Sequence, residues 1–190
     1  IEMFGMEKAN SESYNKLKEY YNANKSVLAL FVLHMYSFQN YIRFNKAQQF
    51  NTPIGVAGYS SDLKNRILKF VSRCPHLSFL NENFINIDWD KFDENTLFYF
   101  DPPYFITKAA YNDGKRGLAG WGINEENCLF SILEHLHKKG FKFIMSNVKE
   151  HKGTKNIKLV EWVNKNNFKM YELGVSGWRY AKNEIIVTNY

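Results

Sequence analysis

The chain contains little cysteine and no long apolar run. Its two cysteines, Cys74 and Cys128, are far apart and form no CxxC pair, which indicates reduced, packed thiols rather than a disulfide framework. No apolar stretch approaches the roughly 18 residues of a membrane span, and no signal peptide is visible. The five histidines are scattered, and none of them has the spacing of metal ligands. We therefore expect a cytoplasmic protein that binds neither a membrane nor a metal.

Aromatic and basic residues, in contrast, are plentiful. Of the 190 residues, 45% are hydrophobic and 17% are aromatic. That is enough for one domain, or one domain with a small lobe, around a packed core. The formal net charge is +6. This excess of positive charge favours a polyanionic partner such as nucleic acid.

Residues 1–75 have the pattern of a mainly helical lobe. Asn10 can cap a first helix, and residues 27–36 are apolar nearly all round, which predicts a buried second helix. Residues 37–59 show no regular period, which indicates a long loop or hairpin region, and loops of that length are often functional. A third helix should follow residues 60–62. Its buried side should hold Leu63, Ile67, Leu68 and Val71.

Residues 76–190 alternate between strand and helix patterns. Helices are predicted from residue 124 to about 139 and at 157–166. Strands are predicted at residues 77–80, 97–100, 141–145, 169–173 and 184–188. This alternation predicts an α/β fold with helices on the faces of a sheet.

Residues 97–104, Leu-Phe-Tyr-Phe-Asp-Pro-Pro-Tyr, are the most informative stretch of the chain. The apolar run predicts a buried strand, and Pro102 and Pro103 must end it and stiffen the backbone that follows. The carboxylate of Asp101, the carbonyl of Pro102 and the ring of Tyr104 would then meet at the carboxyl end of a strand, where α/β sheets bind ligands. This set could grip a planar base by its exocyclic amino group. A strand followed by a Pro-Pro turn explains the same letters equally well.

Two further segments should lie near this edge. A loop at residues 105–122 is flexible enough to close over a substrate. Its glycines are Gly114, Gly117, Gly120 and Gly122. Ser146 and Asn147 should end the strand at residues 141–145, where they could form a pocket wall or cap the following turn.

Several ordered segments resemble the D12-class, Dam-type adenine-N6 DNA methyltransferases. The match runs from about residue 31 to residue 190. Besides residues 101–104, the segments that carry it are Arg43-Phe44-Asn45, Phe50-Asn51, Tyr111-Asn112, Trp121 with Asn124-Glu125-Glu126, residues 139–148, and residues 183–190. Many motifs in matching order are far more specific than one tetrapeptide.

The resemblance implies methyl transfer from S-adenosylmethionine to adenine N6 in double-stranded DNA, after the adenine is flipped out of the stack. Asp101 and the Pro102 carbonyl would accept the two N–H bonds of the amino group, and Tyr104 would stack on the ring. Pro103 completes the implied catalytic set. The resemblance also implies a partial Rossmann-like methyltransferase sheet at residues 76–190 and a helical target-recognition lobe at residues 1–75.

The resemblance also implies cofactor and DNA contacts for residues that stand at matching positions of the family pattern. Asn83 and Phe84 precede the catalytic strand where the family often has an Asp-Phe pair beside the adenine of the cofactor, and Asp101 would border the same site. A turn at the end of a strand explains Asn83 and Phe84 equally well. For DNA, the implied contacts to base edges and phosphates come from Arg43, Asn45, Asn51, Asn40 and Lys46. A solvated polar loop is the alternative for each of these residues.

The glycine-rich turn with which the family binds S-adenosylmethionine is not found in this sequence. We therefore expect the chain to be the C-terminal part of such an enzyme, which needs the missing N-terminal part as a partner and binds the cofactor weakly alone. Two other functions remain open. One is a ribosomal-RNA guanine-N2 methyltransferase, which also carries Asp-Pro-Pro-Tyr after a strand, and the other is a DNA-binding remnant without turnover.

Overall fold

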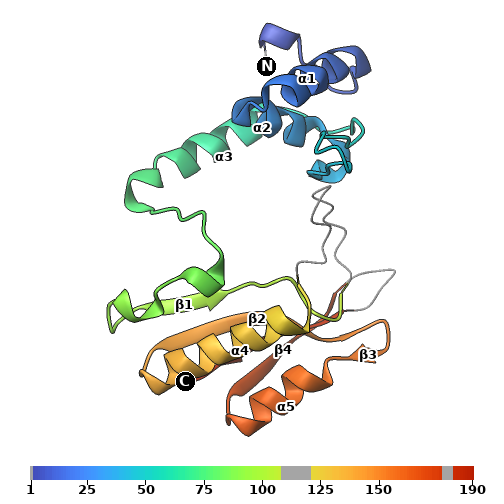
Figure 1. The fold of residues 1–190 in the computed structure, drawn as a ribbon. Coiled ribbons are helices and arrows are strands. Elements are labelled where there is room, and N and C mark those ends of the chain that lie inside the picture. The colour runs from blue at the N-terminus through green and yellow to red at the C-terminus, as the bar shows by residue number, and fades with distance from the viewer. Residues whose placement is uncertain (1, 108–120, 177–181) are drawn as a thin grey trace. The chain divides into compact units, whose positions relative to one another are not determined.

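The computed structural model describes residues 2–107, 121–176 and 182–190 (Figure 1). They form two compact units, and the division along the first part of the chain falls between Asn81 and Glu82. We describe each unit by itself. Within the described residues, no helix has both the length and the apolar character that crossing a bilayer requires.

The described residues of the first unit contain three α-helices: α1 (Ser11–Asn24), α2 (Val27–Tyr36) and α3 (Ser61–Val71). Each begins after a polar residue whose side-chain oxygen accepts a backbone N–H of the first turn. These capping residues are Asn10, Ser26 and Ser60. Short 3₁₀ turns flank the helices at Glu2–Phe4, Phe38–Asn40 and Cys74–His76.

The core of the first unit lies between α1, α2 and the loop at residues 37–59. Its most deeply buried side chains are Tyr14, Leu17, Leu33, Tyr36 and Phe50. The prediction that α2 is buried all round was wrong. Val27 and Leu28 are 79% and 77% exposed, because α1 and the loop cover only one side of α2.

Helix α3 also buries less than its pattern predicts. Leu63 and Ile67 pack against the core of the first unit, but Leu68 and Val71 are more than half exposed. Within its unit, the N-terminal part of α3 therefore packs against the core, whereas the side chains near its C-terminus are largely exposed.

The second unit is a mixed sheet with strand order β1-β2-β5-β4, in which a short β3 also pairs with β2. The strands are β1 (Leu97–Phe100), β2 (Lys142–His151), β3 (Thr154–Lys155), β4 (Lys169–Ser176) and β5 (Lys182–Thr188). Strand β1 runs parallel to β2, and every other pairing is antiparallel. Two 3₁₀ turns precede β1, at Phe84–Asn86 and Trp89–Lys91. This arrangement confirms the α/β class at the level of a mixed sheet with helices.

Among the described residues, the sheet is covered by helices α4 (Ile123–Lys138), which lies between β1 and β2 in the chain, and α5 (Ile157–Lys165) (Figure 1). Their apolar sides pack on Phe143 and Met145 of β2 and on Ile185 and Val187 of β5. The core of the second unit is therefore built on one face of the sheet.

The strand predicted at residues 77–80 was wrong. This segment has no ladder partner among the described residues, and Phe79 and Leu80 are largely exposed. A short apolar run forms a strand only where a neighbouring backbone can complete its hydrogen bonds, which local sequence does not reveal.

The burial predicted for β1 was only half right. Phe98 faces the core, but Leu97 and Tyr99 are 53% and 62% exposed, because no helix of the described chain covers the other face of this edge strand. Strand β2 is longer than predicted and continues to His151, so Ser146 and Asn147 lie inside it rather than at its end.

Candidate functional site

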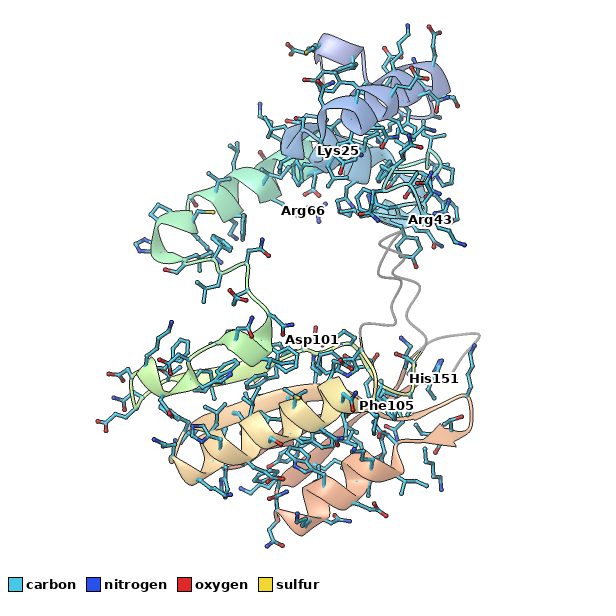
Figure 2. The ribbon with its side chains drawn as sticks, viewed as in Figure 1. Lys25, Arg43, Arg66, Asp101, Phe105 and His151 are labelled. Atoms are coloured by element: carbon cyan, nitrogen blue, oxygen red, sulfur yellow. The ribbon has the colours of Figure 1, made fainter. Side chains whose placement is uncertain are left out.

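Asp101 follows the last residue of β1, at the carboxyl end of the strand (Figure 2). The parallel register places Phe100 opposite Met145, which brings Ser146 of β2 level with Asp101. Ser146 Oγ donates a hydrogen bond of 2.6 Å to Asp101 Oδ1, and the Tyr104 hydroxyl lies 3.3 Å from the same oxygen. Asp101, Tyr104 and Ser146 therefore form one cluster at this end of the sheet.

The two prolines shape the backbone after Asp101. Within the described chain, the Pro102 carbonyl accepts no hydrogen bond, because β1 has already ended. Pro103 is exposed, and Tyr104 is half-buried. The Tyr104 carbonyl accepts from the backbone N–H and from the hydroxyl of Thr107, both at 2.9 Å, which closes a turn after the motif.

The surroundings of Tyr104 shift the pKa of its hydroxyl group. Partial burial raises the pKa of its hydroxyl, and the negative charge of Asp101 raises it further, while a hydrogen bond with Ser146 acts in the opposite direction. The net effect is a Tyr104 hydroxyl whose pKa lies above its usual value of 10.0.

A second polar cluster lies under the sheet, on the side of α4. Glu126 in the first turn of α4 is fully buried, and its Oε2 accepts a 2.8 Å hydrogen bond from the indole N–H of Trp121. Burial raises the pKa of Glu126, while Trp121, Lys158 and Asn147 lower it. Glu126 Oε1 and Asn147 Nδ2 are both buried without a hydrogen bond of normal geometry, although Asn147 is close enough to act on the carboxylate.

Asn83 and Phe84, predicted to lie beside the cofactor, have clear local roles. Asn83 caps the 3₁₀ turn at Phe84–Asn86, and its Oδ1 accepts the backbone N–H of Ile85 at 3.1 Å. The Phe84 ring packs on Trp121 with centroids 5.4 Å apart. Among the described residues, no hydrogen bond or ring contact joins either of them to Asp101, so their proximity to residues 101–104 stays a prediction.

In the first unit, the loop at residues 37–59 folds back on itself as an irregular hairpin. Isolated bridges pair Ser37 with Ile54 and Phe44 with Phe50. Arg43 is exposed on this loop (Figure 2), and its Nε and Nη2 donate to the side chain and the carbonyl of Asn51 at 2.9 and 3.0 Å. The structure thus brings together two of the five predicted DNA contacts, and Asn51 holds the guanidinium by one edge.

Of the other three predicted DNA contacts, two have side chains that are already engaged in hydrogen bonds within the first unit. Asn45 Oδ1 accepts the backbone N–H groups of Ala47 and Gln49, and the Asn40 amide donates to the His34 carbonyl. These two side chains stabilise turns, which the sequence alone did not indicate. Lys46 is exposed and has no partner among the described residues.

The loop is anchored to α1 by contacts that the sequence did not reveal. The Asn22 side chain accepts from the Phe50 N–H at 2.7 Å and donates to the Phe50 carbonyl at 3.1 Å. The buried Tyr14 hydroxyl donates to the Thr52 carbonyl at 3.0 Å. No local signal marks Asn22 for this role, because its partner is 28 residues away.

Some expectations fall outside the described residues. Tyr111, Asn112 and the glycines of the loop predicted at residues 105–122, except Gly122, lie in the segment 108–120. Across residues 2–107, 121–176 and 182–190, no three His, Cys, Asp or Glu side chains are grouped as metal ligands would be.

At the end of β1 the arrangement offers two acceptors and one aromatic ring. Asp101 Oδ1 already receives two donors, whereas Asp101 Oδ2 and the Pro102 carbonyl receive none from the described chain. A planar ligand with an amino group could satisfy both acceptors and stack on Tyr104. The chemistry that suits this geometry is a reaction at an exocyclic amine.

Comparison with known proteins identifies relatives of the whole chain. A family model described as D12 class N6 adenine-specific DNA methyltransferase matches residues 2–175. The modification methylase LlaI of Lactococcus lactis subsp. lactis is 41% identical over 191 residues, and the type II methyltransferase M.FokI of Planomicrobium okeanokoites is 37% identical over 199 residues. Both matches cover 100% of this chain but 31% of the relative, so the chain spans about a third of their length. The DNA adenine methylase of Salmonella typhi is 24% identical over 151 residues, which cover 77% of this chain and 54% of that protein.

Proposed function

The chain belongs to the D12 class N6 adenine-specific DNA methyltransferase family, and from that premise we propose that it takes part in methylating adenine N6 in duplex DNA. The target adenine must leave the helix, because its amino group is otherwise paired within the stack. The observation that carries the proposal is the pair of open acceptors, Asp101 Oδ2 and the Pro102 carbonyl, beside the Tyr104 ring.

The task of these residues is to make a weak nucleophile reactive. The lone pair of N6 is delocalised into the adenine ring. When Asp101 and the Pro102 carbonyl each accept one N–H, they favour a pyramidal nitrogen whose lone pair projects from the ring plane. Tyr104 holds the ring by stacking, so that catalysis is largely a matter of orientation. Asp101 can also hold the proton that N6 releases as the new N–C bond forms.

The methyl donor implied by the family is S-adenosylmethionine, which supplies an electrophilic methyl group on sulfur when bound. Of the residues assigned to it, Asp101 offers an acceptor, Asn83 a side-chain amide N–H, and Phe84 an aromatic ring. The oxygen of Asn83 is engaged in its turn, which leaves its Nδ2 for a ligand. We propose that these residues form only part of the cofactor site.

We further propose that a longer enzyme completes the Rossmann-like sheet beyond β1. Two observations support this extension. The described chain leaves β1 at the edge of the sheet with Leu97 and Tyr99 exposed, and the chain spans 31% of two relatives. The N-terminal part of the same enzyme would be the partner that covers this face.

Residues 1–75 are proposed as the target-recognition lobe, and residues 76–190 as the catalytic core. Arg43 supports the first assignment, because Asn51 occupies one edge of its guanidinium and leaves Nη1 for a base edge or phosphate. Lys46 can add a phosphate contact from the same loop.

The test is a methylation assay of the full-length protein with a radiolabelled methyl donor. Duplex DNA without prior methylation and ribosomal RNA serve as alternative substrates. We expect label in N6-methyladenine of the DNA only. Label in RNA guanine would favour the ribosomal-RNA alternative, and binding of DNA without label in either substrate would favour the remnant.

The decisive variant is Asp101→Ala. A charge-assisted hydrogen bond contributes roughly 1.5–3 kcal/mol, so its loss should lower kcat by roughly one to two orders of magnitude. Glu94→Ala is the matched control, because Glu94 is an exposed acid of the same unit with no partner among the described residues. Near-full activity of Asp101→Ala would show that the proposed catalytic role is wrong.

A further inference from the structure

We propose that Ser146 is a positioning residue, which orients the Asp101 carboxylate so that Oδ2 faces the amino group to be methylated. This inference rests on the proposed function and extends it to a residue on a different strand. Ser146 would touch neither base nor methyl donor and would act through Asp101.

The contact between the two residues is short and specific. Ser146 Oγ lies 2.6 Å from Asp101 Oδ1, whereas its distance to the Phe100 carbonyl is 3.4 Å. The Tyr104 hydroxyl is also within hydrogen-bonding reach of Ser146, but the single hydroxyl proton of Ser146 goes to the carboxylate, because that acceptor is charged and lies at 2.6 Å. A hydrogen bond to an ionised acceptor at this distance belongs to the strong class.

Ser146 is held more firmly than Asp101. It lies within β2, which is paired on both sides, with β1 and with Ile186 of β5. Ser146 is only 8% exposed, whereas Asp101 is exposed and lies beyond the last ladder residue of an edge strand. The hydrogen bond thus transmits the fixed position of the central strand to a carboxylate that would otherwise rotate.

The hydrogen bond fixes the angle of the carboxylate, with one oxygen engaged and the other open. Oδ1 receives the Ser146 hydroxyl and lies 3.3 Å from the Tyr104 hydroxyl, so its lone pairs are occupied. Oδ2 has no partner in the described chain and is left for the N6 amino group. Without Ser146 the carboxylate could turn about its Cβ–Cγ bond to other angles, and the oxygen that faces N6 would no longer be held in the direction of its N–H.

The experiment compares Ser146→Ala with the parent in the full-length protein, under single-turnover and steady-state conditions. We expect kcat to fall about tenfold or more, as for the loss of one charge-assisted bond, while the KM for DNA stays within about twofold. The fluorescence of 2-aminopurine at the target position should also be unchanged, because base flipping precedes the step that Ser146 serves. Ser131→Ala is the matched control, since Ser131 donates only to the Asn127 carbonyl within α4.

Conservative variants separate positioning from folding. Ser146→Thr keeps the hydroxyl and should keep most of kcat, whereas Ser146→Cys, a weaker donor, should lose about as much as alanine. These two variants decide the question if Ser146→Ala fails to fold. Equal kcat in Ser146→Thr and Ser146→Cys, or full kcat in Ser146→Ala, would overturn the inference.

A double variant distinguishes this inference from the proposed function. If Ser146 acts through Asp101, adding Ser146→Ala to Asp101→Ala should lower kcat no further. Additive losses would show that Ser146 acts independently. Retained activity in Asp101→Ala would instead refute the proposed function, whatever Ser146→Ala does.

Discussion

Glu126 gives a pH-dependent stability that one substitution should remove. Burial raises the pKa of this carboxyl above its usual 4.5. Between pH 4.5 and the folded-state pKa, the folded chain therefore keeps a proton on Glu126 that the unfolded chain has lost. The contribution of Glu126 to stability is therefore fully present below pH 4.5 and is lost as pH rises through the folded-state pKa. One proton corresponds to a slope of at most about 1.4 kcal/mol per pH unit.

Glu126→Gln should flatten this slope, since glutamine does not titrate. The introduced amide can accept from Trp121 or from Asn147 but leaves the other donor facing its own NH₂ group, so we expect a constant loss of about 1 kcal/mol. This constant loss in the free energy of unfolding does not test the titration of Glu126. The test is how the free energy of unfolding changes with pH.

Urea unfolding of parent and variant at several values between about pH 5 and pH 8 measures the difference. Asp90, Glu125 and Glu172 have lowered pKa values, so their titrations affect stability at lower pH and cancel between the two proteins. We expect the parent to lose stability relative to the variant as pH rises. A difference that stays constant over this range would refute the reasoning.

Two further predictions concern other parts of the chain. Arg43→Ala should weaken DNA binding by the full-length protein and reduce its salt dependence, measured by titration against labelled duplex, while Lys16→Ala on α1 should leave both unchanged; equal effects would contradict a specific role. Asn189→Ala removes the acceptor of the Phe143 N–H at 2.9 Å and a donor to the Phe141 carbonyl at 2.8 Å, so it should lower the free energy of unfolding by about 2 kcal/mol. The Phe143 amide should then exchange faster with deuterium, and unchanged exchange would argue against this bond.

Elements with strong local signals could be predicted from the sequence. Asn10 and Ser60 mark helix starts because their side chains satisfy the first backbone N–H groups. The prediction failed where the burial of a side chain depends on which distant segment packs against its helix. Residues 27–36 are apolar on every side, yet Val27 and Leu28 are exposed. The rest of their unit packs against the opposite side of the helix and leaves these two side chains uncovered.

The candidate site shows the same division between local and distant information. The Asp-Pro-Pro-Tyr letters indicate a strand end with open acceptors, because proline cannot continue a ladder. The pairing of Asp101 with Ser146 joins residues 45 positions apart, and no local pattern predicts it. Asn45 and Asn40 have side chains suited to bases, but their hydrogen bonds stabilise turns, which only the folded loop reveals.

The parallel register of β1 and β2 makes the end of the sheet that holds Asp101 sensitive to the length of one strand. Phe100 lies opposite Met145, and successive side chains of β2 alternate between the two faces. Inserting or deleting one residue in β2 before Ser146 would present Met145 or Asn147 to Asp101 in its place. The irregularity of β2 instead falls after Val148, beyond the contact. Variation in strand length near Asp101 should therefore be tolerated in natural variants only on the far side of Ser146.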